Sequence, residues 1–385
     1  MPHKSYSNSL KKCSDSHRLP FMKENPAALL LRDVDILFKE FRHRKIGLPT
    51  RLVMAPLPRF LSQNGVPTAE MLKYYLRRAQ NLVGMIITEP VAVDDSAAAA
   101  DSGMAHFYGG SALRAWKGIC RAVHTTPCRI APQLCHVGML RPEQGDMPYV
   151  SSPAIGPSGI DARTGENRGE VMSKMRIRSV VQAFATAATS ARVLGFDAVE
   201  INGGQGCLIE QFLRADTNLR TDEYGGDLLS RCRFACEIVH AVRKGTGRGF
   251  PVIFRFSLNG VLPNQPPLVS NAEELASFLR LLVGAGVDIF TCAGAPADAP
   301  AFAGSDLSLA GWTRLITGCS VIAEGEIGLE SRMLTSLVQR MLRGEIDLAS
   351  VGRALLADAE WGRKIHMADE HLILPYSRRA WGRLF

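Results

Sequence analysis

Residues 178–202 read RSVVQAFATAATSARVLGFDAVEIN, and this stretch contains the repeating unit of the fold. Apolar side chains recur at helical spacing from Val180 to Val193, and Gly195 follows them where a glycine commonly ends a helix. Residues 198–202 are apolar enough for a strand that is buried on both faces. The stretch therefore predicts a helix followed directly by a strand of a covered parallel sheet.

The same alternation continues along the chain in both directions. Strands are predicted at 51–55, 85–89, 130–135, 198–202, 252–257, 288–292, 321–324 and 348–352. Helices are predicted at 69–82, 111–124, 178–194, 228–243, 272–284, 309–317, 330–343 and 354–368, with Gly284 and Gly344 marking two of the helix ends. Eight such units in roughly 330 residues predict an α/β fold, a single (β/α)8 TIM barrel over 33–385, preceded by a flexible basic arm over 1–32.

Composition excludes several classes of protein. The 385 residues are 46% hydrophobic, too apolar for a disordered chain, and no run of about 20 apolar residues predicts a membrane span. The net charge of +8 is concentrated in the first 45 residues, which indicates a solvated arm rather than a nucleic-acid site. Nine scattered cysteines without a C-x-x-C motif predict no metal site and free thiols, and the N-terminus lacks the apolar core of a secretory signal. A reducing, cytoplasmic location is therefore expected.

A barrel places its active site at the carboxyl ends of its strands. Strands seven and eight end in AEGEIG (323–328) and VGR (351–353), where the fold usually binds phosphate through backbone N–H groups. Gly325 and Gly352 allow close approach and Arg353 adds a cationic fork, although both glycines could simply form tight turns. Gln133 and Arg255 lie near the carboxyl ends of strands three and five. A heteroaromatic ring with carbonyl groups would satisfy them there, or they could be structural polar residues.

Several motifs resemble those of the old yellow enzyme family of FMN-dependent oxidoreductases. They are TRLVMAP (50–56), QLCHVG (133–138), EIN (200–202), RTDEYGG (220–226), Arg255 and Gly352-Arg353. The resemblance covers about residues 35–360 and extends to the barrel domain of bacterial 2,4-dienoyl-CoA reductases. Because this chain ends soon after the barrel, the iron–sulfur and FAD parts of those reductases are not expected here.

The resemblance implies a non-covalent FMN and assigns its ligands. Met54, Ala55 and Pro56 would lie along the isoalloxazine, Gln133 and Arg255 would bind its pyrimidine side, and Gly325, Gly352 and Arg353 would hold the phosphate. NADH or NADPH is implied as the reductant. By the same resemblance, Pro58 would lie near the flavin O4 atom, where the family has Thr or Cys. Pro90 would lie near the N5 and O4 edge, where a backbone N–H could approach the flavin but proline has none.

The substrate side departs from the family pattern. Asn202 and Gln205 replace the pair that grips a carbonyl oxygen, Cys207 replaces the proton-donating tyrosine, and Phe60 is a further candidate substrate contact. Cys207 could supply a proton or could be a small buried packing residue.

The expected function is hydride transfer at flavin N5 to or from a small organic substrate. An FMN-dependent dehydrogenase, desaturase or isomerase on the same fold and a non-catalytic flavin-binding protein are the alternatives, and an RNA-acting dihydrouridine synthase is a weaker one. A homo-oligomer is compatible with the family, and membrane or nucleic-acid partners are not expected.

Overall fold

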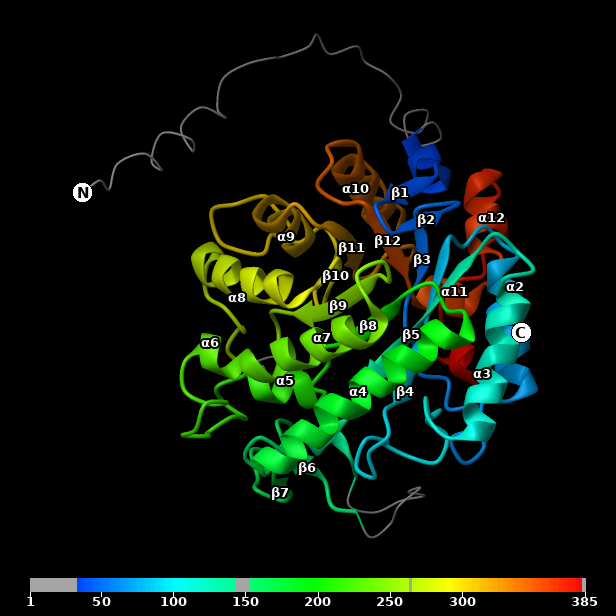
Figure 1. The fold of residues 1–385 in the computed structure, drawn as a ribbon. Coiled ribbons are helices and arrows are strands. Elements are labelled where there is room, and N and C mark those ends of the chain that lie inside the picture. Colours follow the sequence, from blue (N-terminus) through cyan, green and yellow to red (C-terminus); the bar gives the residue numbers. More distant parts are fainter. Residues whose placement is uncertain (1–32, 143–151, 263–264, 383–385) are drawn as a thin grey trace.

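The computed structural model describes residues 33–142, 152–262 and 265–382, and within them eight parallel strands close into a barrel (Figure 1). Each strand pairs with the next strand of the ring in chain order, so the predicted (β/α)8 barrel is confirmed. The strands are β3 (Leu52–Met54), β4 (Met85–Ala92), β5 (Arg129–Cys135), β8 (Val199–Asn202), β9 (Val252–Ser257), β10 (Ile289–Ala293), β11 (Ser320–Glu324) and β12 (Leu348–Val351). The expected arm lies outside the described residues, so the division at residue 32 stays a prediction.

Helices surround the strand ring, as Figure 1 shows. The long ones are α2 (Ala69–Ala79), α3 (Gly110–Val123), α4 (Lys174–Leu194), α7 (Arg233–Thr246), α8 (Ala272–Ala285), α9 (Leu309–Thr317) and α10 (Ser331–Leu342). The short ones include α5 (Leu208–Leu213), α6 (Leu228–Arg231), α11 (Arg353–Ala357) and α12 (Trp361–His366). Helix α4 begins where the Ser173 side chain accepts the Arg176 N–H, and it ends at Gly195 with φ of 96°.

Several predicted helix boundaries are wrong. The helix predicted at 69–82 ends at Ala79. Gly284 lies inside α8, and the helix ends at Gly286 instead, whose N–H bonds the carbonyls of Leu282 and Val283. The segment 228–243 divides into α6 and α7 at Cys232. The segment 354–368 divides into α11 and α12 because Asp358 is extended and caps the backbone that follows it.

The amino end of the barrel is closed by a hairpin. Strands β1 (Phe41–His43) and β2 (Ile46–Leu48) pair antiparallel, and their apolar side chains join a buried cluster with the first residues of the barrel strands. Lys45 in the turn forms an ion pair with Asp288, just before β10, at 2.5 Å. The base of the barrel is therefore apolar and filled, which leaves the carboxyl ends of the strands for polar chemistry.

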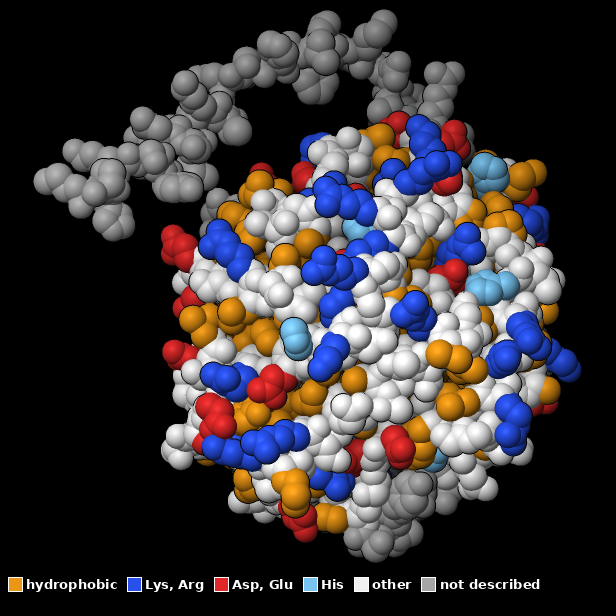
Figure 2. Space-filling view, viewed as in Figure 1, with side chains coloured by type: hydrophobic (Ala, Val, Ile, Leu, Met, Phe, Trp, Pro, Cys, Tyr) orange, Lys and Arg blue, Asp and Glu red, His pale blue; other side chains and the backbone are white. Residues whose placement is uncertain are grey.

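Three features of the described residues concern membranes, metal ions and surface charge. In the described ranges no helix is both long and apolar enough to cross a membrane. The same residues contain no group of three or more His, Cys, Asp or Glu side chains that could hold a metal ion. On the face drawn in Figure 2, Lys and Arg side chains are interspersed with acidic and neutral ones rather than gathered in one stripe.

Candidate active site

A buried polar network occupies the barrel above its apolar base. Glu200 on β8 is fully buried and accepts hydrogen bonds from Gln133 Nε2 at 2.7 Å and from Thr291 Oγ1 at 2.6 Å. Burial raises the pKa of Glu200 to about 7, and the nearby charge of Arg255 opposes that rise. The network therefore holds the side chain of Gln133 in a fixed position between β5 and β8.

Arg255 is the central cation of this network. It lies opposite Asn202 in the β8–β9 register, is 2% exposed, and forms an ion pair with Glu324 at 2.5 Å. Its Nε and Nη1 atoms are buried without a hydrogen-bond partner among the described residues, and so is Oε1 of Gln133. Buried polar groups are normally paired, so these atoms indicate a ligand that supplies both acceptors and a donor.

A pocket of about 460 Å³ opens beside Arg255, a size typical of a small-molecule site. Four predicted site residues line it: Gln205, Arg255, Gly325 and Arg353. The wall is completed by Ser257, Asn259, Gly260, Val261, Gly294, Ala295, Pro296, Glu324 and Glu326. The sequence prediction assigned no role to these residues, although Ser257 ends β9 and Gly294 directly follows β10, so the strand-end rule reaches both.

The loops after β10 and β11 approach each other through glycine. Gly325 has φ of 146°, and a Cβ atom there would lie 1.9 Å from the carbonyl oxygen of Ala295. Only glycine allows this contact between the two loops. At the start of α11, Arg353 is half-buried and its only ion pair in the described residues is with Glu326 at 3.5 Å, a separation that leaves the guanidinium available to an anion.

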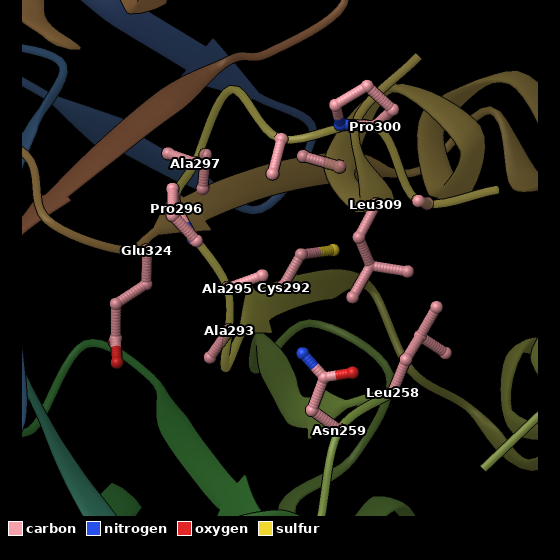
Figure 3. Close-up of a pocket in the computed structure, with 14 residues that line it drawn as sticks. Leu258, Asn259, Cys292, Ala293, Ala295, Pro296, Ala297, Pro300, Leu309 and Glu324 are labelled. Carbon is pink, nitrogen blue, oxygen red and sulfur yellow. The ribbon is translucent and has the colours of Figure 1, made fainter. Parts of the chain in front are cut away.

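A second cavity of about 70 Å³ lies behind the same loop and shares Asn259, Pro296 and Glu324 with the larger pocket. Figure 3 shows Glu324 on one side of this cavity and Cys292 and Leu309 on the other. Its walls are mostly small apolar side chains, so it can accept only a small apolar group.

The segment after β3 borders the site without lining the pocket. Met54, Ala55 and Pro56 are buried and Pro58 is half-buried. Phe60 is 51% exposed with a left-handed φ of 51°, an uncommon backbone conformation for an aromatic residue. Gly352 lies close enough to this segment that its Cβ would be 3.3 Å from that of Ala55.

Glu89 on β4 holds this segment in place. Its carboxylate accepts the N–H groups of Arg59 at 3.0 Å and Phe60 at 3.2 Å, and also the hydroxyl of Tyr75 at 3.3 Å. The pairing of β4 with β5 shifts register between Ile87 and Pro90, which surrounds Glu89 with irregular backbone. Glu89 was not assigned a role from the sequence, because no motif reveals its bonds to two backbone N–H groups and to the distant Tyr75 hydroxyl.

The free energy of unfolding is expected to fall as the pH rises from about 4.5 to 7, in part because of Glu89. Burial raises the pKa of Glu89 from 4.5 to about 7, so the folded state binds more protons than the unfolded state in that window. The rise from 4.5 to about 7 corresponds to about 3 kcal/mol. Urea denaturation of Glu89→Gln across the window should show a shallower decline than the parent. An identical decline would contradict this role, and Glu273→Gln at the exposed start of α8 is the control.

The three predicted catalytic residues do not converge on one point. The Asn202 amide nitrogen lies 3.6 Å from both Cys135 Sγ and Cys207 Sγ, and its oxygen accepts the Gly204 N–H. Gln205 is exposed on the pocket wall, with φ of 58°. Cys207 is 7% exposed, and the pKa of its thiol lies well above the usual value because of the bond from Cys135 and because of burial.

Comparison with known proteins identifies the family of the chain. Residues 36–371 match the model of the NADH:flavin oxidoreductase / NADH oxidase family. A metal reductase of Desulforamulus reducens is 29% identical over 89% of this chain and 50% of its own length. An NADPH dehydrogenase of Bacillus cytotoxicus is 29% identical over 85% of this chain and 91% of its own. The chain spans about half the length of several curated relatives it matches.

Solved structures share the fold. Morphinone reductase superposes with a TM-score of 0.77 at 24% identity, covering 90% of this chain and 92% of its own. The old yellow enzyme homologue from Zymomonas mobilis superposes with a TM-score of 0.76 at 23% identity, covering 90% and 96%. Since the family model spans most of the barrel and its strand-end loops, the chain belongs to the NADH:flavin oxidoreductase / NADH oxidase family, the old yellow enzyme family that its motifs resemble.

Proposed function

We propose that the chain binds FMN and transfers hydride between flavin N5 and a small organic substrate, with NADH or NADPH as reductant. The observation that carries the proposal is a set of buried atoms without a hydrogen-bond partner among the described residues, namely Oε1 of Gln133 and the Nε and Nη1 atoms of Arg255. Arg255 lines the 460 Å³ pocket, and Gln133 is held by its hydrogen bond to Glu200. The pyrimidine side of a flavin carries carbonyl acceptors and an N–H donor, which complement these groups. Curated relatives named NADH oxidase and NADPH dehydrogenase support the choice of reductant.

Each part of the site has a distinct role in this proposal. Arg255 holds a fixed positive charge where negative charge develops on reduction, in a place where water cannot screen it. The loops at Gly325 and Gly352, with Arg353, bind the phosphate, and the buried segment 54–56 packs along the ring system. FMN supplies the hydride-exchanging N5 atom. Gln205, which lines the pocket, orients the substrate.

The absorption spectrum of the purified protein tests the cofactor. Flavin bands are expected, and acid should release FMN that is identified by chromatography. FAD, or no flavin after reconstitution, would contradict the proposal. Rapid mixing with NADH and NADPH then tests the reductant, and a bound flavin that neither reduces would favour a non-catalytic flavin protein.

An oxidative or isomerising reaction on the same flavin is the second candidate. It is favoured by Cys207, because a buried thiol whose pKa is raised is a poor proton donor at neutral pH. Dehydrogenation or desaturation needs no such acid.

Reduction of simple enones is therefore expected to be slow. General acid catalysis typically contributes about 10² to 10⁴ in rate, and the family's phenol is replaced by Cys207. Steady-state rates with cyclohexenone should lie that far below those of a tyrosine-containing relative, and Cys207→Tyr should raise them. A parent rate equal to the relative's would contradict the reading of Cys207. Cys207→Ala is the matched variant, since it removes the thiol without adding an acid.

A further inference from the structure

Two cysteine thiols lie in contact beside the candidate active site. The proposed hydride transfer does not require them to act together. Cys135 at the end of β5 and Cys207 before α5 are 72 residues apart in the chain, and their sulfur atoms lie 3.5 Å apart. The Cys135 thiol donates to Cys207 Sγ, and the amide nitrogen of Asn202 lies 3.6 Å from each sulfur. The three side chains are buried and form one cluster.

The cluster is coupled to the pocket. The positive charge of Arg255, which lines the pocket, favours the thiolate of Cys207. Gln205 lies two residues before Cys207 and also lines the pocket, and a Cβ at Gly206 would be 2.5 Å from the side chain of Val261 on the pocket wall. As residues, Cys207 is 7% exposed and Cys135 1%, and Cys207 follows the pocket residue Gln205 by two positions, so the first attack is assigned to Cys207.

We propose that Cys135 and Cys207 form a redox-active dithiol that reduces small-molecule disulfides and is re-reduced by NADH or NADPH through the flavin; the second half rests on the proposed function. A sulfur pair this close, with an amide donor on each sulfur and a fixed cation nearby, is arranged to form and break a disulfide bond. Burial and the bond from Cys135 keep Cys207 protonated in the resting state, so each cycle moves two protons with two electrons.

The exchange balances in two steps. The Cys207 sulfur attacks the substrate disulfide, breaks its S–S bond and releases one substrate thiol. The Cys135 sulfur then attacks Cys207 of the mixed disulfide and releases the second substrate thiol. The two protons of the dithiol end on the two released thiols, and the two electrons reduce the substrate while the protein gains the Cys135–Cys207 bond. In the return half, one NADH or NADPH and one solvent proton would supply, by way of the flavin, the two electrons and two protons that break this bond and restore both thiols. Asn202 stabilises each transient thiolate by hydrogen bonding.

The first experiment treats anaerobic holoenzyme with bis(2-hydroxyethyl) disulfide, followed by denaturing alkylation and peptide mass spectrometry. The parent should lose two alkylatable thiols, release two mercaptoethanol molecules per chain and yield a peptide linking Cys135 to Cys207. In Cys135→Ser, a stable mixed disulfide should remain on Cys207. Full alkylation of both residues in the parent would overturn the proposal, and so would a persistent mixed disulfide there.

A matched control comes from the other close pair. Cys232 and Cys236, 3.6 Å apart at the junction of α6 and α7, lie outside the pocket. Cys232→Ser should therefore form the Cys135–Cys207 link as the parent does. A link that is lost in Cys232→Ser would overturn the assignment.

The second experiment counts electrons. Disulfide-treated holoenzyme, freed of reagent, is titrated anaerobically with NADH or NADPH and its flavin absorbance is followed. Four electrons per chain are expected for the parent and two for Cys207→Ser. Two electrons in both would overturn the link to the flavin. A protein without flavin would fail the proposed function instead, and the thiol count of the first experiment would still decide whether the pair is redox-active.

Discussion

The Arg255→Ala substitution is expected to lower the free energy of unfolding by about 3 kcal/mol. It is also expected to lower the reduction potential of the bound flavin. The substitution removes the partner of Glu324 and the charge nearest to buried Glu200, and loss of one member of a buried pair typically costs about 3–5 kcal/mol. The loss in the free energy of unfolding is expected at the lower end of this range, because Glu324 is partly exposed and Glu200 can protonate near neutral pH. The same charge would stabilise the reduced flavin, so its loss disfavours reduction.

Denaturant titration measures the first effect and spectroelectrochemical titration the second. Arg255→Lys separates them, because it keeps the charge while it loses the guanidinium fork. The lysine variant should recover most of the potential and only part of the stability. A potential that does not move in Arg255→Ala would place Arg255 away from the flavin.

Gly325→Ala is expected to weaken FMN binding by about 100-fold, or about 3 kcal/mol, because the loops after β10 and β11 would have to separate. The new Cβ would lie 1.9 Å from the carbonyl oxygen of Ala295, and both loops line the pocket. Gly318→Ala is the control, since Gly318 also has positive φ, at 67°, but its Cβ would meet nothing within 4 Å.

Fluorescence titration of the apoprotein with FMN measures both variants. Gly318→Ala should bind FMN as the parent does and lose only about 1 kcal/mol of stability to the left-handed backbone. Equal affinity in Gly325→Ala and the parent would contradict a role for this loop contact in cofactor binding.

The barrel was predictable from the sequence because its signals are local. The strand at 252–257 is apolar except for Arg255 and Ser257 and coincides with β9. The helix at 309–317 coincides with α9 between the Ser308 cap and Gly318. Where two local signals competed, the prediction was wrong: Gly284 and Gly286 are both plausible stops, and it is Gly286 that takes the positive φ of 123° and bonds the last carbonyls of the helix.

The site was predictable only in part, because the missing contacts join distant segments. Gln205, Arg255, Gly325 and Arg353 were predicted and line one pocket. Cys135 stands in a predicted motif, but its contact with Cys207 depends on how β5 meets the turn after β8. Spacing in the chain carries no information about such a meeting.

The hairpin at the base of the barrel has a consequence for the order of events. Because the apolar residues of the hairpin close the amino end of the barrel, ligands enter from the carboxyl end of the strands. Under the proposed function, the electron donor and the electron acceptor enter by the same opening and bind one after the other. Double-reciprocal plots of initial rates at several fixed donor concentrations should therefore be parallel. Each reactant in excess should inhibit the reaction, because it occupies the binding site that the other reactant needs.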